Sequence, residues 1–505
     1  MAAKSIMVVG TMSSAGKSFI TAGLCRIFRQ DGLRTVPFKS QNMALNSYIT
    51  ADGLEMGRAQ VMQAEAAKVE PDVRMNPILL KPNSDSGSQV IVNGEVYGSM
   101  GAREYYTKKE ELIPHIMKAF NSLAQENDAV VLEGAGSPAE INLKDVDIVN
   151  MGMAKLSDSP VILVGDIDRG GVFASVYGTI MLMDEEERRR IRGIVINKFR
   201  GDVEILKPGL KMLEDLTGVP VLGVVPYAQL DLEDEDSLSE RLTRRTLQKG
   251  AKLDLVVIRL PRISNFTDFE VLERIDGVSV RYVTQAREMG SPDIILLPGT
   301  KNTMADLRWM RQNGIEAEIL KQHEKGSVVF GVCGGFQMLG RTLSDPQGVE
   351  DGGSMRGMGL LDTETVFLPQ KRRTRMNGVI CSVNGVFEEL SGLSVSGYEI
   401  HMGETKGLDE AVPFTVLETG ETDGYCNADG TVFGSYLHGI FDNSEMAQGM
   451  VQALLKRKGV NADEFKPFDL ETYKQQQYDK LADILRENLD MNKIYDILNR
   501  REVKA

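Results

Sequence analysis

One cysteine stands in a setting that is typical of a catalytic nucleophile. Cys333 follows the apolar run 328–332 within the pattern Gly-x-Cys-x-Gly, and a segment with helical character comes next. A strand that turns sharply into a helix lifts a nucleophile above the sheet, and flanking glycines keep side chains out of the turn. We therefore predict that Cys333 is a nucleophile. The alternative is a small buried apolar residue.

A cysteine nucleophile needs a general base, and the chain offers four histidines. His438 follows the apolar run 431–435 and so lies at the end of a predicted strand, which makes it our first choice. His401 is the second choice. For His115 and His323 we favour a structural role.

A glycine-containing loop near the N-terminus joins an apolar run to a predicted helix. Gly10 and Gly16 enclose five residues, and Lys17 and Ser18 follow. The spacer is one residue longer than in the common phosphate loop. The longer loop can still bind phosphate in the usual way. The N–H groups at a helix N-terminus face the anion, the lysine adds positive charge and the serine can ligate Mg²⁺. The loop therefore predicts binding of ATP with Mg²⁺.

Three further polar residues end predicted strands of the same half. Glu133 is predicted to share the metal with Ser18, and Lys39 to neutralise a transferring phosphoryl group. Asn197 is predicted to meet the nucleotide or the substrate. A solvated acid and a surface lysine are the alternatives for Glu133 and Lys39. Weaker metal candidates are Asp52 and Glu55.

Composition limits the classes of protein that need to be considered. The 505 residues predict two or three domains, and the net charge of −14 argues against a broad nucleic-acid-binding face. No apolar run approaches the roughly 18 residues of a membrane span. Four well-separated cysteines without a CxxC pair argue against a zinc site or a disulfide framework. We expect a cytoplasmic protein with no nucleic-acid partner.

Short apolar runs alternate with helical segments in both halves of the chain, which predicts α/β domains with parallel sheets. We predict a synthetase-type domain over 1–235, a linker over 236–250 where charge changes from acidic to basic, and a second domain over 251–445. Residues 446–505 are predicted to form a helical C-terminal extension. Its apolar stripe, a predicted docking face, consists of Leu481, Ile484, Leu485 and Leu489.

A phosphate site in one half and a thiol in the other suit one reaction, the synthesis of amides from glutamine. The thiol attacks the side-chain amide and releases ammonia through an acyl-enzyme. Backbone N–H groups at Gly334 and in the turn at Gly299 are the predicted oxyanion donors. ATP meanwhile converts a carboxylate into an acyl phosphate that ammonia attacks.

The whole chain resembles the cobyric acid synthase family of cobalamin biosynthesis. The runs that carry this resemblance are 37–47, 132–143, 165–173 and 196–202. The first half is similar to dethiobiotin synthetase, whose phosphate loop has the same longer spacer. The second half is similar to class I glutamine amidotransferases, which implies a flavodoxin-like α/β domain.

The resemblance also implies a substrate and site roles. The substrate would be adenosylcobyrinic acid a,c-diamide, amidated at its b, d, e and g carboxylates with one ATP and one glutamine each. Cys333 would be the nucleophile with His438 as its partner. Asp147 would help the acyl phosphate to form or react, with a helix-capping role as the alternative. The corrinoid is a substrate, so we predict no protein ligand to cobalt.

One position departs from the class I pattern. Ordinary members carry His-x-Glu, but Ile440 stands two residues after His438. Either the Cys–His dyad suffices, or another acid such as Glu399 orients the imidazole. A poorly fixed tautomer predicts modest glutaminase activity when the synthetase site is empty.

Other functions are also compatible with parts of this pattern. The nearest are a cobyrinic acid a,c-diamide synthase and a cell-wall amidotransferase. A partitioning or sensor ATPase with a phosphate loop would turn over ATP without glutamine. A corrinoid-binding protein usually carries the signature Asp-x-His-x-x-Gly, which is absent here.

Overall fold

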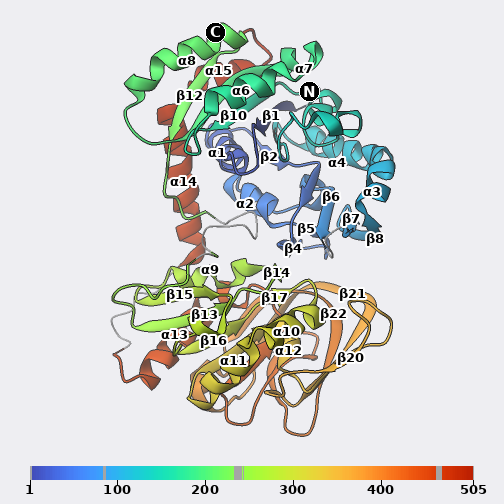
Figure 1. The fold of residues 1–505 in the computed structure, drawn as a ribbon, viewed down its shortest axis with the longest axis vertical. Helices are drawn as coiled ribbons and strands as arrows, with labels where there is room; N and C mark the ends of the chain where they lie inside the picture. The colour runs from blue at the N-terminus through green and yellow to red at the C-terminus, as the bar shows by residue number, and fades with distance from the viewer. Residues whose placement is uncertain (1–2, 83–86, 233–241, 243, 462–468, 504–505) are drawn as a thin grey trace. The chain divides into compact units, whose positions relative to one another are not determined.

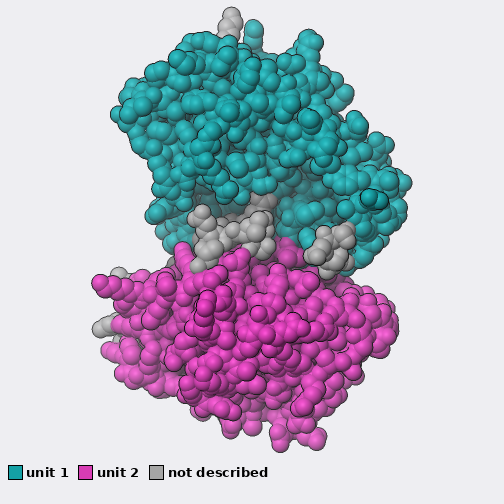
Figure 2. Space-filling view, viewed as in Figure 1, with its two compact units in different colours: residues 1–44, 55–233, 471–505 teal, residues 45–54, 234–470 magenta. Residues whose placement is uncertain are grey.

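The computed structural model describes residues 3–82, 87–232, 242, 244–461 and 469–503. The chain divides into two compact units (Figure 2). Unit 1 consists of residues 1–44, 55–233 and 471–505, and unit 2 of residues 45–54 and 234–470. The short segment 45–54 therefore belongs to unit 2 although it comes early in the sequence.

Unit 1 is built on a parallel sheet of six strands in the order β12-β11-β10-β1-β9-β2 (Figure 1). The strands are β1 (Lys4–Gly10), β2 (Thr35–Phe38), β9 (Ala129–Glu133), β10 (Val161–Asp166), β11 (Ile191–Phe199) and β12 (Val221–Pro226). The strands predicted from the apolar runs of this half are confirmed, with some ends shifted. The strand order changes direction beside β1, and ligands of such sheets bind at the carboxyl ends next to this point.

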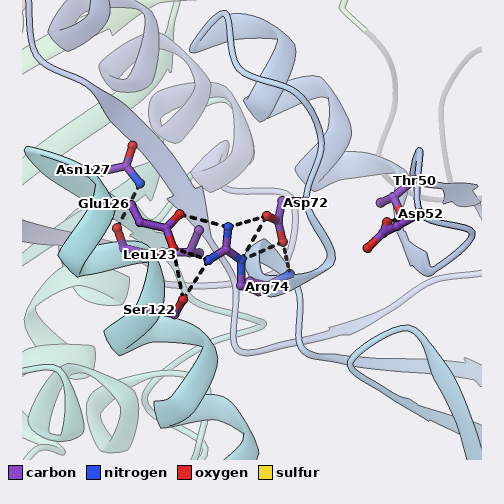
Figure 3. A network of polar contacts seen from close by, with 8 residues as sticks. All are labelled: Thr50, Asp52, Asp72, Arg74, Ser122, Leu123, Glu126 and Asn127. Atoms are coloured by element: carbon purple, nitrogen blue, oxygen red, sulfur yellow. Dashed lines mark hydrogen bonds and ion pairs between the residues drawn. The ribbon is translucent and has the colours of Figure 1, made fainter.

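Helices connect these strands, and a smaller sheet is inserted between β2 and β9 (Figure 1). The helices include α1 (Lys17–Gln30), α2 (Arg58–Ala66), α4 (Ile113–Glu126), α6 (Val172–Met181) and α8 (Val203–Thr217). The inserted sheet contains β3 (Gln41–Met43), β6 (Ile78–Pro82), β7 (Gly87–Val92) and β8 (Glu95–Gly101). Arg74 anchors the chain just before β6 of this sheet, because it pairs with Asp72 at 2.6 Å and with Glu126 of α4 at 2.7 Å (Figure 3).

The C-terminal helices α14 (Leu470–Asn488) and α15 (Met491–Leu498) complete the core of unit 1. The predicted apolar stripe is confirmed as a docking face, since Leu481, Leu485 and Leu489 are buried in that core. Arg26 of α1 is 1% exposed and pairs with Asp479 at 2.8 Å. The preceding helix α13 (Ser444–Arg457) packs in unit 2. The structure thus divides the segment 446–505 between the two units.

Unit 2 contains five parallel strands in the order β15-β13-β16-β18-β25. They are β13 (Leu253–Ile258), β15 (Val278–Val283), β16 (Ile294–Leu297), β18 (Val328–Val332) and β25 (Val432–Ser435). In chain order this is 2-1-3-4-5, the flavodoxin arrangement. An antiparallel extension includes β21 (Thr363–Ile380) and β22 (Ser394–Gly407). The predicted fold class, two α/β domains, is confirmed.

The region around the predicted linker 236–250 is described only in part. Residues 236–241 and 243 lie outside the described residues. Further on, Arg244 and Arg245 form ion pairs with Glu273 and Glu288 of unit 2. Within the described ranges, no helix is long and apolar enough to cross a membrane.

The packing of α14 on α1 predicts different outcomes for two helical glycines. A Cβ on Gly23 would lie 2.2 Å from Cδ1 of Leu485, whereas one on Gly178 of α6 would meet nothing within 4 Å. Gly23→Ala should therefore lower the free energy of unfolding of unit 1 by roughly 1–3 kcal/mol through overpacking. Gly178→Ala should leave it unchanged or raise it by up to about 1 kcal/mol. Urea denaturation measures both, and equal effects would contradict the docking of α14.

Candidate active sites

Cys333 lies in a tight elbow between β18 and the short helix α12 (Gly334–Leu339). Its φ of 52° and ψ of −111° are rare for an L-residue, and such strain is concentrated at functional positions. A Cβ on Gly331 or Gly335 would come within 2.6 or 2.1 Å of backbone atoms, so neither position accepts a side chain. The predicted strand–elbow–helix is therefore present, and Sγ points to the carbonyl oxygen of Ile400 at 3.7 Å.

His438 is held by a buried carboxylate that the sequence analysis missed. Its Nδ1 bonds Oδ2 of Asp268 at 2.7 Å, and Oδ1 accepts the N–H of Gly439 at 2.9 Å. Burial by itself lowers the pKa of His438, but the Asp268 carboxylate and the hydrogen-bonded sulfur of Cys333 raise it to about 10. Because Nδ1 is occupied by Asp268, Nε2 is the nitrogen available to Cys333.

Glu399, the acid considered from the sequence, does not orient His438. It pairs with Arg372 at 2.6 Å, and burial raises its pKa to about 7. The acid at the imidazole is Asp268. Of the two alternatives, the structure therefore favours another acid at His438 over a dyad without one, and that acid is not Glu399. The signal for Asp268 was a lone carboxylate between Phe266 and Phe269, shortly after the first strand of unit 2.

The other histidines lie in structural contacts. The Nδ1 of His401 is 2.6 Å from the carbonyl oxygen of Gly403, the ring stacks on Tyr436, and burial lowers its pKa to about 3. His401 therefore stays neutral near pH 7. His115 contacts Asn93 at 3.4 Å and His323 contacts Thr431 at 3.1 Å, which fits the structural roles favoured for both.

The two glycines predicted to donate to the oxyanion lie beside the elbow. A Cβ on Gly299 would come within 2.9 Å of Cε1 of His438, and one on Gly334 within 3.1 Å of the backbone N of Thr300. The turn itself is fixed, because Thr300 Oγ1 donates to the buried carboxylate of Asp306 at 2.6 Å. Gly299 thus lies beside His438, and Gly334 lies beside the turn at Thr300. Donation from their N–H groups to an oxyanion, which attack on a carbonyl requires, stays a prediction.

Asn197, near the end of β11, packs against the phosphate loop. Gly16 has a φ of 98°, and a Cβ there would lie 2.0 Å from Nδ2 of Asn197. The same amide donates to the carbonyl oxygen of Ala15 at 3.0 Å, so Asn197 shapes the loop. A contact between Asn197 and a nucleotide stays a prediction. Lys17 spans the loop, with Nζ 3.0 Å from the carbonyl oxygens of both Met12 and Gly136.

Ser18, Lys39 and Glu133 form one cluster beside the loop. Oε1 of Glu133 accepts from Ser18 Oγ at 3.0 Å and from Lys39 Nζ at 2.9 Å. Glu133 and Lys39 are 1% and 3% exposed, so the solvated alternatives for both are wrong. Gln63 of α2 donates to Oε2 of Glu133. No motif pointed to Gln63, because it comes from a helix distant in sequence.

The donor set at this cluster suits Mg²⁺. A hydroxyl and a carboxylate supply hard oxygen ligands, and the remaining ligands would come from ATP phosphates and water. The part of the chain that the structure describes holds no group of three or more His, Cys, Asp or Glu residues placed to bind a metal. The weaker candidates lie elsewhere: Asp52 accepts a hydrogen bond from Thr50 (Figure 3), and Glu55 pairs with Lys81 at 2.8 Å.

Asp147 caps the start of α5 (Met151–Leu156). Its carboxylate accepts backbone N–H groups of Val149, Asn150 and Gly152 at 2.8 to 2.9 Å. Asn150 in turn donates to the carbonyl oxygen of Ala135 at 2.7 Å, next to the Gly136 carbonyl that Lys17 contacts. Asp147 therefore stabilises the segment around Ala135 and Gly136 that contacts Lys17. Its direct role in acyl phosphate chemistry stays a prediction.

Comparison with known proteins gives the class first. Residues 6–238 match the CobQ/CobB/MinD/ParA nucleotide binding domain, and residues 254–446 match the CobB/CobQ-like glutamine amidotransferase domain. Together with the two sites, these matches define an amidotransferase that uses a nucleotide.

Curated relatives then give the family. The cobyric acid synthase of Ruminiclostridium cellulolyticum is 58% identical over 98% of this chain and 97% of its own length. The proteins of the same name from Lachnoclostridium phytofermentans and Listeria monocytogenes are 54% and 51% identical, over 98% and 99% of this chain and 99% and 98% of their own lengths. The chain belongs to the cobyric acid synthase family and is a glutamine-hydrolysing ligase. This membership argues against the partitioning ATPase and the a,c-diamide synthase.

The geometry at His438 predicts a large effect of one isosteric substitution. Asp268→Asn keeps the volume but removes the charge that holds the imidazole, so glutaminase kcat/KM should fall on the order of 100-fold or more. The loss of the carboxylate also returns the pKa of His438 toward its ordinary value. In the pH profile of the remaining glutaminase activity, the decline at high pH should therefore begin at a lower pH than in the wild-type enzyme.

The matched control for this substitution is Glu399→Gln, which should keep most of the glutaminase activity. Synthesis from free ammonia should be unchanged in both variants. If the two variants lose equal activity, Asp268 does not orient His438.

Proposed function

We propose that this enzyme converts adenosylcobyrinic acid a,c-diamide into adenosylcobyric acid by amidating the b, d, e and g carboxylates. Each amide would use one ATP and one ammonia released from glutamine. The observation that carries the proposal is one chain with two complete sets of groups, the Cys333–His438–Asp268 set and the phosphate-loop cluster around Glu133. The relatives named cobyric acid synthase support the choice of substrate.

In unit 2, the Cys333 thiolate attacks the side-chain amide carbon of glutamine. The N–H groups of Gly334 and Gly299 stabilise the oxyanion, and the His438 imidazolium gives its proton to the departing ammonia. Water, deprotonated by His438, then cleaves the glutamyl thioester and releases glutamate. Asp268 keeps Nδ1 bonded throughout, so that Nε2 faces the reacting atoms.

In unit 1, the N–H groups of the phosphate loop and the ammonium groups of Lys17 and Lys39 hold the ATP phosphates. A substrate carboxylate attacks the γ-phosphorus, ADP leaves, and ammonia displaces phosphate from the acyl phosphate. Ser18 and Glu133 would hold Mg²⁺, which when bound neutralises charge on the phosphate oxygens. Lys39 would also neutralise charge on the phosphate oxygens, because its ammonium group lies beside Ser18 and bonds the same Oε1 of Glu133.

Mass spectrometry of the corrinoid product tests this proposal. With ATP, Mg²⁺ and glutamine, the wild-type enzyme should give four successive carboxylate-to-amide conversions. Cys333→Ala should give none with glutamine but the full series with ammonium, because only the glutaminase centre is lost. Glu133→Gln should slow the series with either nitrogen source.

Two results would contradict the proposal. The first is a wild-type enzyme that adds no amide to the diamide with either nitrogen source. The second is a Cys333→Ala variant that still uses glutamine.

A further inference from the structure

The segment 45–54 packs against the wall of the glutaminase centre within unit 2. Ile49 of β4 (Ser47–Ile49) is fully buried and forms a small apolar cluster with Tyr398 and Ile400. Ile400 is the residue whose carbonyl oxygen accepts from Cys333 Sγ. Residues from the N-terminal part of the chain therefore pack directly against a residue that contacts the nucleophile.

Polar contacts tie the same segment to two residues of unit 2. The Ser47 N–H donates to Oδ1 of Asn265 at 2.9 Å, and the Tyr398 hydroxyl donates to the Ser47 carbonyl oxygen at 3.0 Å. Nδ2 of Asn265 donates to the Tyr398 hydroxyl at 3.3 Å, which closes a buried ring of three residues. Asn265 has a φ of 51°, in the left-handed region that most non-glycine residues avoid and that asparagine tolerates.

Tyr398 and Asn265, the two partners of Ser47, each contact one member of the His438–Asp268 pair. Tyr398 and His438 exchange two backbone hydrogen bonds, at 3.1 and 2.9 Å, and their rings stack at 5.4 Å. Asn265 opens the turn that carries Asp268, whose N–H donates to the Asn265 carbonyl oxygen at 3.1 Å. Ser47 is therefore linked to the base through Tyr398 and to its carboxylate through Asn265.

The segment is also continuous with the phosphate centre. Lys39, which bonds Glu133, and β3 of unit 1 immediately precede it in the chain. Only residues 40–44 separate Lys39 from the segment, so the covalent path from the phosphate centre to Ser47 is short.

We propose that segment 45–54 is a positioning element that couples the two reactions, with Tyr398 and Asn265 as its positioning residues. Binding of ATP and a carboxylate substrate at unit 1 displaces Ser47, and the buried ring transmits this to His438 and Asp268. Glutamine hydrolysis is then fast only when an acyl phosphate can form. This inference rests on the proposed function and adds its regulation.

The test is the stimulation of glutaminase activity by ATP, Mg²⁺ and the corrinoid diamide together. Tyr398→Phe removes the hydroxyl that joins Ser47 and Asn265, but keeps the ring and the backbone bonds to His438. The stimulated-to-basal ratio of kcat/KM should fall on the order of tenfold in this variant. Synthesis from ammonium should be unchanged, because unit 1 is intact.

Two further variants separate coupling from general damage. Tyr48→Phe makes the same chemical change at the residue after Ser47. The Tyr48 ring lies 5.4 Å from the Tyr398 ring, but the Tyr48 hydroxyl bonds Arg375, so this variant should keep the wild-type ratio. Asn265→Gly keeps the left-handed backbone and removes the amide, so it should lose stimulation as Tyr398→Phe does.

The outcomes are distinguishable. The coupling is refuted if the wild-type enzyme shows no stimulation, or if Tyr398→Phe and Asn265→Gly keep the wild-type ratio. It is also refuted if they lower basal and stimulated rates by one common factor, because that indicates a structural role only. Failure of the proposed function looks different, since the wild-type enzyme would then form no amide even with ammonium.

Discussion

The hydrogen bond between Asp268 and His438 is the contact on which the glutaminase centre depends. A buried carboxylate is costly unless it is paired, and this one receives both the imidazole and the N–H of Gly439. In return it fixes the imidazole orientation and favours its charged form. The strained elbow at Cys333 can then present sulfur to a base that is already oriented.

Sheet topology brings these three residues together. Asp268 follows β13, Cys333 follows β18 and His438 follows β25, and all three strands are parallel members of one sheet. Their carboxyl ends share an edge, so groups far apart in sequence meet there. The same rule operates in unit 1, where Ser18 follows β1, Lys39 follows β2 and Glu133 ends β9. Two different chemistries therefore use the same property of parallel sheets.

The features that short sequence patterns predicted are those formed by residues close together in the chain. The glycine pattern around Cys333 and the loop before Lys17 are local signatures, and buried parallel strands appear as short apolar runs. The pairing of Asp268 with His438 was not predictable in this way, because the two residues are 170 positions apart. Their meeting depends on strand order, which no short pattern encodes. Gln63 was missed for the same reason, since α2 reaches Glu133 only through tertiary packing.

Two other differences have physical causes. The C-terminal segment is helical as predicted, but buried Arg26 and the close approach of Gly23 hold α14 on unit 1, whereas α13 completes the core of unit 2. For Asp147 the resemblance implied a role at the acyl phosphate, with helix capping as the alternative, and its carboxylate accepts three backbone N–H groups at the start of α5. In both cases the residue pattern was visible, and its structural partner was not.

Nitrogen-15 NMR of histidine-labelled protein tests the central claim most directly, because the chain has only four histidines. His438→Gln assigns the ring signal. If Asp268 and Cys333 hold the imidazole, the signal of His438 should stay that of a charged ring through neutral pH and titrate near pH 10. A His438 ring that is neutral at pH 7 in the wild-type enzyme would contradict the account.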